Sequence, residues 1–192
     1  MRRRVGILIS GGGSNMAALI AASRADDCPY EVVLVLSNTP QAGGLAVARA
    51  QGVEARVIDQ RQHPRDREGH ERAIDAALRQ AGVEVVALAG YMRILTPFLV
   101  EAWRDRMLNI HPSLLPLYPG LDTHNRALAD GAVQHGCTVH KVTLGVDEGP
   151  IIGQSVVPVL RGDDPASLQA RVLAAEHELY PRCLADFVKS LD

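Results

Sequence analysis

The stretch "VGILISGGGSN" (residues 5–15) joins a nearly continuous apolar segment to a glycine-rich turn. The apolar segment has the length of one strand, and residues 16–24 after the turn are typical of a helix. A strand without polar alternation is typical of a parallel sheet that helices cover on both faces. The stretch therefore predicts the first strand, turn and helix of an α/β domain.

The same alternation of apolar strands and helices continues along the chain. We expect further strands at 31–38, 54–59, 83–90 and 107–110, and helices around 45–52 and at 66–82 and 96–103. This order predicts a doubly wound, mostly parallel, Rossmann-like sheet. In sheets of this class the ligand binds beyond the carboxyl ends of the strands.

The pattern changes after about residue 135. Segments 137–144 and 151–160 are two strands joined by the turn "GVDEGP" (145–150), and they predict an antiparallel C-terminal extension of the sheet. A last helix is expected over 164–191. Pro181 lies inside it and should kink or break it, because proline removes a backbone donor and crowds the preceding turn.

Bulk composition excludes several classes of protein. The chain has 192 residues, 47% of them apolar and 22% charged, and a net charge of −2, so we expect one globular domain that binds neither nucleic acid nor a membrane surface. No apolar run approaches the roughly 20 residues of a membrane span. The apolar run after "MRRR" is too short for a secretion signal. Three widely spaced cysteines predict reduced thiols in a cytoplasmic protein.

The glycine-rich turn "SGGGSN" (10–15) is a candidate phosphate site, because glycines allow close approach and a helix N-terminus attracts anions. A dinucleotide fingerprint fails, since Met16 stands where the third glycine is needed and Asn38 ends the second strand without an acidic group. The P-loop pattern fails as well. A cradle for one phosphate remains, with side-chain donors from Ser14 and Asn15. A tight turn with serine as the helix N-cap explains the stretch equally well.

Two polar residues stand near the end of the strand in "RMLNIHPSLLP" (106–116). Alternation puts Asn109 and His111 on one face, with Ile110 on the other, and Pro112 ends the strand where ligands bind in this fold. An amide can donate to an oxyanion, and an imidazole can transfer protons near neutral pH. For this pair alone, capping of the strand end is the more economical interpretation. Asp147 gains interest only if folding brings it against His111.

Other chemistries find less support. The seven histidines form no HExxH pattern, and no cysteine pair has zinc spacing, so we expect no metal. The G-x-S-x-G elbow of a serine hydrolase is also missing.

Five motifs occur together in the chain: "SGGGSN" (10–15), "LAGYMRIL" (88–95), "LNIHPSLLPLYPG" (108–120), "VDEGPII" (146–152) and "EHELYP" (176–181). In this order, over about residues 4–188, they resemble the phosphoribosylglycinamide formyltransferases, a branch of the folate-dependent formyltransferase family. The resemblance implies one formyltransferase domain over 1–192. Its phosphate-binding half would cover about 1–100, and its folate-binding and catalytic half about 88–192.

The resemblance also implies the reaction and its residues. A formyl group would pass from 10-formyltetrahydrofolate, a co-substrate, to the amine of 5′-phosphoribosylglycinamide in purine (IMP) synthesis. The residues implied are Asn109, His111 and Asp147 for catalysis, Gly13, Ser14, Asn15 and Glu176 for the ribonucleotide, and Arg67, Met92, Arg93, Ile94, Leu95 and Asn109 for the folate.

In the mechanism that the resemblance implies, Asn109 and a protonated His111 stabilise the oxyanion of a tetrahedral intermediate. Asp147 raises the pKa of His111, and His111 assists proton transfer to the departing folate nitrogen. The partners implied are small molecules, and the chain could be a monomer or a homodimer. Leu117 and Asp122 depart from residues that are common in the family, in a loop near the site.

Two rival functions stay open. A formyltransferase that acts on a sugar-nucleotide amine fits the catalytic residues, but it fits a one-phosphate cradle less well. A nucleotide-binding protein without chemistry fits the sheet. It predicts that Asn109 and His111 can be replaced with little consequence.

Overall fold

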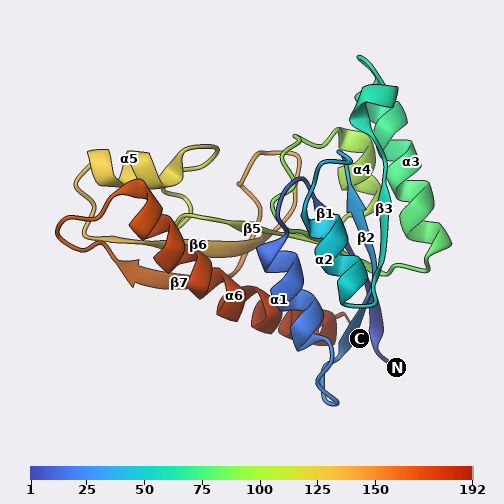
Figure 1. Cartoon of the computed structure of the whole chain (residues 1–192), viewed down its shortest axis with the longest axis horizontal. Coiled ribbons are helices and arrows are strands. Elements are labelled where there is room, and N and C mark those ends of the chain that lie inside the picture. Colours follow the sequence, from blue (N-terminus) through green and yellow to red (C-terminus); the bar gives the residue numbers. More distant parts are fainter. Residues whose placement is uncertain (192) are drawn as a thin grey trace.

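The computed structural model describes residues 1–191, and within them the chain forms a seven-stranded sheet in the order β3-β2-β1-β4-β5-β6-β7 (Figure 1). The strands from β3 to β5 are parallel, and β6 is antiparallel to both of its neighbours. The predicted fold class is confirmed. The strands are β1 (Arg3–Ile9), β2 (Tyr30–Ser37), β3 (Glu54–Val57), β4 (Val85–Leu88), β5 (Met107–His111), β6 (Gln134–Lys141) and β7 (Ile151–Pro158).

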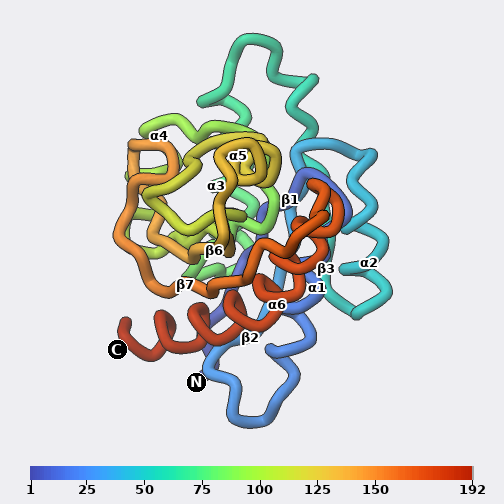
Figure 2. The backbone as a smooth tube through the Cα atoms, turned by 90° about the vertical axis from the view of Figure 1, so that its left-hand side faces the viewer, coloured from blue at the N-terminus to red at the C-terminus, as the bar shows by residue number. Residues whose placement is uncertain are grey.

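Helices cover both faces of the sheet. One buried cluster packs the sheet against α1, α2 and α6, and a second packs its other face against α3 and α4. Figure 2, turned by 90°, shows the two groups on opposite sides. The helices are α1 (Ser14–Ala22), α2 (Gly44–Ala50), α3 (Arg67–Gln80), α4 (Pro97–Ala102), α5 (Thr123–Ala129) and α6 (Pro165–Lys189), with a 3₁₀ turn, η1, at Gln60–Gln62.

The long helix α6 continues through Pro181, so of the two expected effects of this proline, a kink or a break, the break does not occur. An internal proline costs about 3 kcal/mol. Buried side chains on both sides of it, among them Leu179 and Leu184, hold the helix against the sheet. Tyr180 adds to this, because its hydroxyl lies 3.0 Å from the carbonyl oxygen of Leu88 and 3.2 Å from that of Leu108. The packing of α6 against the sheet therefore outweighs the tendency of Pro181 to interrupt the helix.

Two further elements differ from expectation. Helix α5 (Thr123–Ala129) was not predicted, because its seven residues are too few to display a period beside the prolines before them. Strand β6 lies three residues earlier than expected, since His135 and Gly136 already pair with β7. The connection to β7 therefore covers residues 142–150, and it carries Asp147.

The strand order brings three loops to one edge of the sheet. Strands β1, β4 and β5 are neighbours, and all three are parallel, so residues 10–13, 89–96 and 112–122 leave the sheet at the same edge. This edge includes the point where the order of the strands reverses, at which open α/β sheets bind ligands.

Candidate active site

Asn109 and His111 share a face of β5, as predicted. Leu108 and Ile110 turn to the opposite face, where they join the cluster with α6. His111 is 5% exposed and Asn109 is half-buried. Both side chains therefore stand at the carboxyl end of a core strand, which holds them with little freedom.

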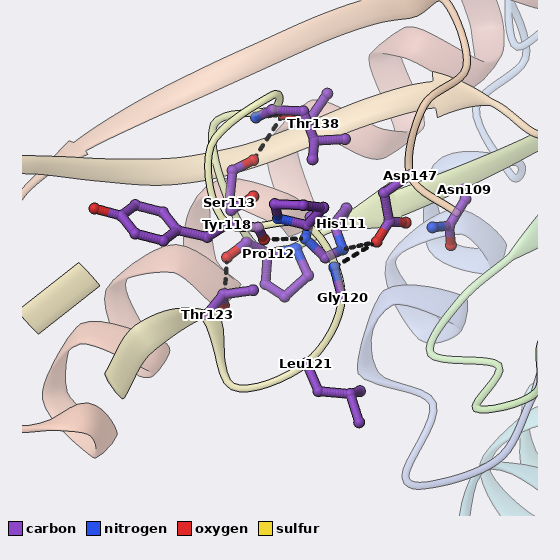
Figure 3. Close-up of polar contacts among 12 residues, drawn as sticks. Asn109, His111, Pro112, Ser113, Tyr118, Gly120, Leu121, Thr123, Thr138 and Asp147 are labelled. Atoms are coloured by element: carbon purple, nitrogen blue, oxygen red, sulfur yellow. Dashed lines mark hydrogen bonds and ion pairs between the residues drawn. The ribbon is translucent and has the colours of Figure 1, made fainter. Parts of the chain in front are cut away.

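Asp147 lies against His111 (Figure 3). Its Oδ2 atom is 3.3 Å from Nδ1 of His111, and the same oxygen accepts a hydrogen bond of 2.9 Å from the amide of Gly120. The carboxylate comes from the connection between β6 and β7, where Asp147 has a left-handed φ of 56°. Folding thus supplies the contact that the sequence left open, and it brings the predicted trio together.

The second nitrogen of His111 is also engaged. Nε2 lies 2.9 Å from the carbonyl oxygen of Tyr118 (Figure 3), and it must carry a proton to donate to that acceptor. Nδ1 is then the ring nitrogen that remains free to exchange a proton, and it faces Asp147. The loop after β5 therefore fixes the tautomer of the histidine.

Burial and neighbouring groups act in opposite directions on the pKa values of the pair. Burial lowers the pKa of His111, and this outweighs the hydrogen bond to Tyr118 and the charge of Asp147, which both raise it. Asp147 thus acts on the pKa of His111 in the expected sense, but burial sets the net direction, which is downward. Burial also raises the pKa of Asp147, but the neighbouring His140 and His111 side chains and the hydrogen bond from Gly120 lower it more, so its net shift is downward.

His140 is a site residue that the sequence did not reveal. It pairs with Asn109 across the β5–β6 ladder. Its Nδ1 donates to the carbonyl of Lys141 over 2.9 Å, which leaves Nε2 to accept from the Asn109 amide at 3.2 Å. Nε2 is also 3.6 Å from Oδ1 of Asp147. His140 therefore orients the amide of Asn109 and lies beside the carboxylate of Asp147. The sequence predicts that β6 belongs to an antiparallel extension, but it reveals neither that β5 is its neighbour nor the register of that pair.

We name residues 112–122 the active-site loop. Its two ends are tied together by the hydroxyl of Thr123, which donates to the carbonyl of Pro112 over 2.8 Å (Figure 3). Within the loop, the hydroxyl of Ser113 donates to the carbonyl of Leu117 over 2.6 Å. Leu117, at 57% exposure, projects from the loop, and Asp122 ends it as the residue before α5. Both departures from the family pattern thus lie on the exposed side of the loop.

The glycine-rich turn forms an open helix N-terminus. The N-cap of α1 is Gly13, at φ 73°, without a capping side chain, so serine does not cap this helix. A Cβ atom at Gly13 would lie 3.0 Å from Cα of Gly44. The turn borders a recess of about 290 Å³ that residues 10–15 line together with Ala89, Gly90 and Met92. Peptide N–H groups at such a turn can bind one phosphate.

Asn15 and Glu176, 161 positions apart, meet beside this turn. The amide of Asn15 donates to Oε2 of Glu176 over 2.7 Å, and both side chains are buried. Burial raises the pKa of Glu176 to about 7, against the opposing effect of the bond from Asn15. One of the two amide protons of Asn15 is thus already used, and Glu176 exchanges its proton near neutral pH.

We name residues 91–96 the folate loop, after the role that the family resemblance implies for residues 92–95. Its first part is fixed by the amide of Met92, which donates to Ser10 Oγ at 2.8 Å, and its end by the amide of Thr96, which donates to Glu71 Oε1 at 2.8 Å. Between them, the peptide groups of Arg93, Ile94 and Leu95 make no hydrogen bond within residues 1–191. Arg67 stands exposed at the start of α3, one turn before Glu71.

A second recess lies beside the connection between β6 and β7. It measures about 510 Å³, and its walls include Val100 of α4 and residues 141–145. The sequence motifs reach this lining only at the turn 145–150, and the rest of it mixes apolar side chains with charged ones such as Glu101 and Lys141. The part that these lining residues play depends on whether a ligand held by the folate loop or the active-site loop also enters this recess.

Neither a metal site nor a membrane-spanning helix is found among residues 1–191, the part of the chain that the structure describes. No group of three or more His, Cys, Asp or Glu side chains is arranged to hold a metal ion there. No helix in that part of the chain combines the length and the apolar character that crossing a membrane requires.

The Rossmann-like sheet, with Asn109, His111 and Asp147 at its ligand-binding edge, fits a group-transfer domain. The formyl transferase family matches residues 3–184, and the chain belongs to that family. Within it, the chain is similar to phosphoribosylglycinamide formyltransferases. That of Escherichia coli K12 is 42% identical over 181 residues, which cover 94% of this chain and 85% of the relative. The crystal structure of that from Brucella melitensis matches with a TM-score of 0.94 and 52% identity, over 98% of this chain and 96% of the other.

Longer relatives contain the same domain. The trifunctional purine biosynthetic protein adenosine-3 of Drosophila pseudoobscura pseudoobscura is 47% identical over 186 residues. The match covers 96% of this chain and 14% of the relative, so the chain spans about one seventh of that protein.

Proposed function

We propose that this chain transfers the formyl group of 10-formyltetrahydrofolate to the amine of 5′-phosphoribosylglycinamide, a step of purine (IMP) synthesis. The observation that carries the proposal is the buried contact between His111 and Asp147, 3.3 Å apart, beside the half-buried amide of Asn109. This contact stands at the carboxyl end of β5. Strand β5 neighbours β4, and β4 neighbours β1, so the loops that follow β4 and β1 lie at the same edge of the sheet. The family and the relatives reported above support the same reaction.

The ribonucleotide would bind at the N-terminus of α1. Gly13, Ser14 and Asn15 would hold its 5′-phosphate, because their peptide N–H groups border a recess wide enough for a single phosphate. Glu176, fixed by Asn15, would accept a hydrogen bond from a ribose hydroxyl. This arrangement leads the glycinamide amine toward the end of β5.

The folate would bind on the other side of the cluster. Peptide groups of residues 93–95 are open to hydrogen bonds, and a pterin edge presents the complementary N–H and C=O groups. Met92 and Ile94 flank them as exposed apolar side chains, and Arg67 would meet the carboxylates of the folate tail. The recess near Val100 offers room for the ring. The folate supplies the formyl group and is consumed, so no metal is required.

The amine attacks the formyl carbon and creates a tetrahedral centre with an oxyanion. Asn109 donates one amide proton to His140 and keeps the other for this oxygen. A well-placed donor of this kind contributes roughly 10²–10³ in rate. His140 thereby holds Asn109 in the orientation that stabilises the charge.

The carbon–nitrogen bond to N10 of the folate then breaks, and N10 takes up a proton while the attacking amine loses one. His111 Nδ1 is the ring nitrogen available for this transfer, because Tyr118 holds Nε2. Asp147 stabilises the imidazolium that exists during the transfer, since its own pKa is lowered and it stays anionic. An ordered water would carry the proton away from the amine.

We extend the proposal to the whole chain: residues 1–192 act as one cytoplasmic formyltransferase domain, with its phosphate-binding half over about 1–100 and its folate-binding half over about 88–192. Its partners would be these two small molecules, without nucleic acid or membrane, as a monomer or a homodimer.

A formyl-transfer assay tests the reaction. Purified protein is mixed with 10-formyltetrahydrofolate and either 5′-phosphoribosylglycinamide or an amino-sugar nucleotide, and the release of tetrahydrofolate is followed. We expect turnover with the ribonucleotide. Turnover with the amino-sugar nucleotide alone would move the assignment to the rival transferase, and turnover with neither would favour a binding protein.

A further inference from the structure

Helix α3 contributes a buried carboxylate to the end of the folate loop. Glu71 is 3% exposed. Its Oε1 accepts the amide of Thr96 at 2.8 Å, and its Oε2 accepts the hydroxyl of the same residue. Two hydrogen bonds from one residue to a buried carboxylate form a rigid contact, because charge-assisted bonds of this kind are stronger than neutral ones.

This contact fixes the loop at one particular point. The loop is tied at Met92 by Ser10, and it has no other backbone hydrogen bond within the described residues before Thr96. Glu71 therefore sets where the open peptide groups of residues 93–95 come to rest. Without it, the second end of the loop would be held only where Thr96 caps α4, through its carbonyl and the amide of Val100.

The same helix also carries Arg67. Glu71 follows Arg67 by four positions, which is one helical turn, so the two lie on one face of α3. A carboxylate that ties the folate loop to this face also fixes the distance between the loop and Arg67. The two parts expected to contact opposite ends of the folate are thus joined through Glu71.

Other contacts between α3 and α4 lie farther from the loop. The indole of Trp103 donates to Oδ1 of Asp75 over 3.0 Å, and Arg72 lies 4.3 Å from the ring centre of Phe98. Asp75 is one further turn along α3 from Glu71. It joins the same two helices without touching the folate loop, so it offers a matched control.

We propose that Glu71 is a positioning residue for the formyl folate: it holds the folate loop at Thr96 and so determines the affinity for the folate without contacting it. The inference rests on the proposed function. It is separate from the catalytic trio, and it assigns to α3 a part in selecting the co-substrate.

The test compares Glu71→Gln, Thr96→Val and the control Asp75→Asn in the full chain. Steady-state kinetics give kcat and the Michaelis constant for each substrate, calorimetry gives the dissociation constant of tetrahydrofolate, and thermal unfolding reports stability. For Glu71→Gln we expect the Michaelis constant for the formyl folate and the dissociation constant of tetrahydrofolate to rise roughly tenfold, since one charged bond is replaced by a neutral contact. The Michaelis constant for the ribonucleotide and kcat should stay within about twofold.

Thr96→Val keeps the amide bond and loses the hydroxyl, so a smaller rise in the same two constants is expected, and it serves as the test if Glu71→Gln does not fold. Asp75→Asn should lower the unfolding temperature and leave both folate constants unchanged. Equal effects of Asp75→Asn and Glu71→Gln on the folate constants would reduce Glu71 to a structural role and overturn the proposal. Unchanged binding of tetrahydrofolate by folded Glu71→Gln would do the same. Failure of the native protein to formylate the ribonucleotide, with tetrahydrofolate still bound, would instead refute the proposed function alone.

Discussion

Nε2 of His111 lies 2.9 Å from the carbonyl oxygen of Tyr118, while Nδ1 of the same ring lies 3.3 Å from Asp147. One contact comes from the active-site loop and the other from the connection between β6 and β7. The first fixes which nitrogen carries the resting proton, and the second stabilises the ring when it gains another. The two loops therefore act together on one imidazole.

Ser113→Ala tests the role of the active-site loop. This change removes the hydroxyl bond to the carbonyl of Leu117, next to Tyr118. The hydrogen bond to Tyr118 raises the pKa of His111, so a loosened loop should lower that pKa further. We expect kcat to fall roughly three- to tenfold and its alkaline limb to move to lower pH. A pH profile of kcat measures both the fall in kcat and the shift of the alkaline limb. An unmoved profile would contradict the role assigned to the active-site loop.

Asp147→Asn removes the charge and keeps an oxygen for the amide of Gly120. The pKa of His111 should fall further, because Asp147 raises it. We expect the fold to survive and turnover to drop by about 10²–10⁴-fold, the range of lost proton-transfer catalysis. Circular dichroism and kcat are the measurements. A folded variant with nearly native turnover would show that the carboxylate is dispensable.

Glu176→Gln should change how stability depends on pH. The pKa of Glu176 rises from 4.5 to about 7 in the folded chain, so the folded state retains a proton that the unfolded state loses. Glu176 therefore makes stability fall as pH rises from about 4.5 to 7, by at most about 3 kcal/mol. The Glu176→Gln variant has no titrating group at this position, so it does not lose this stability as the pH rises. Urea unfolding at pH 5 and pH 8 should show the variant gaining relative to the native chain at pH 8, and a constant difference would refute the raised pKa.

Gly13→Ala tests the phosphate turn. A methyl group at φ 73°, 3.0 Å from Cα of Gly44, must displace the turn that precedes α1. We expect the Michaelis constant for the ribonucleotide to rise by roughly tenfold or more, with that for the folate unchanged. Gly52→Ala is the control, because it has a similar φ of 74° in open space. Equal effects of the two changes on the Michaelis constant for the ribonucleotide would exclude a specific phosphate site.

The parallel part of the sheet could be predicted from sequence because β1, β2 and β4 are largely apolar and alternate with helical segments. Asn109 and His111 could be placed on one face because alternation along a strand is a local property. Their meeting with Asp147 could be expected only from the family resemblance, since 36 residues separate His111 from the carboxylate.

Other features depend on long-range geometry that no local pattern contains. His140 contacts Asn109 through the register of two antiparallel strands, and Glu71 reaches Thr96 from a different helix. The net direction of the pKa of His111 also escaped prediction, because it is decided by how deeply the ring is buried. Burial at a strand end depends on the loops that cover it.

The most direct test of the central claim is the rate of formyl transfer from 10-formyltetrahydrofolate to 5′-phosphoribosylglycinamide by the native chain and by His111→Ala. We predict turnover by the native chain and a loss of about 10²–10⁴-fold in kcat for a folded His111→Ala, because no other group replaces Nδ1 beside Asp147. Turnover by His111→Ala close to that of the native chain would contradict the account.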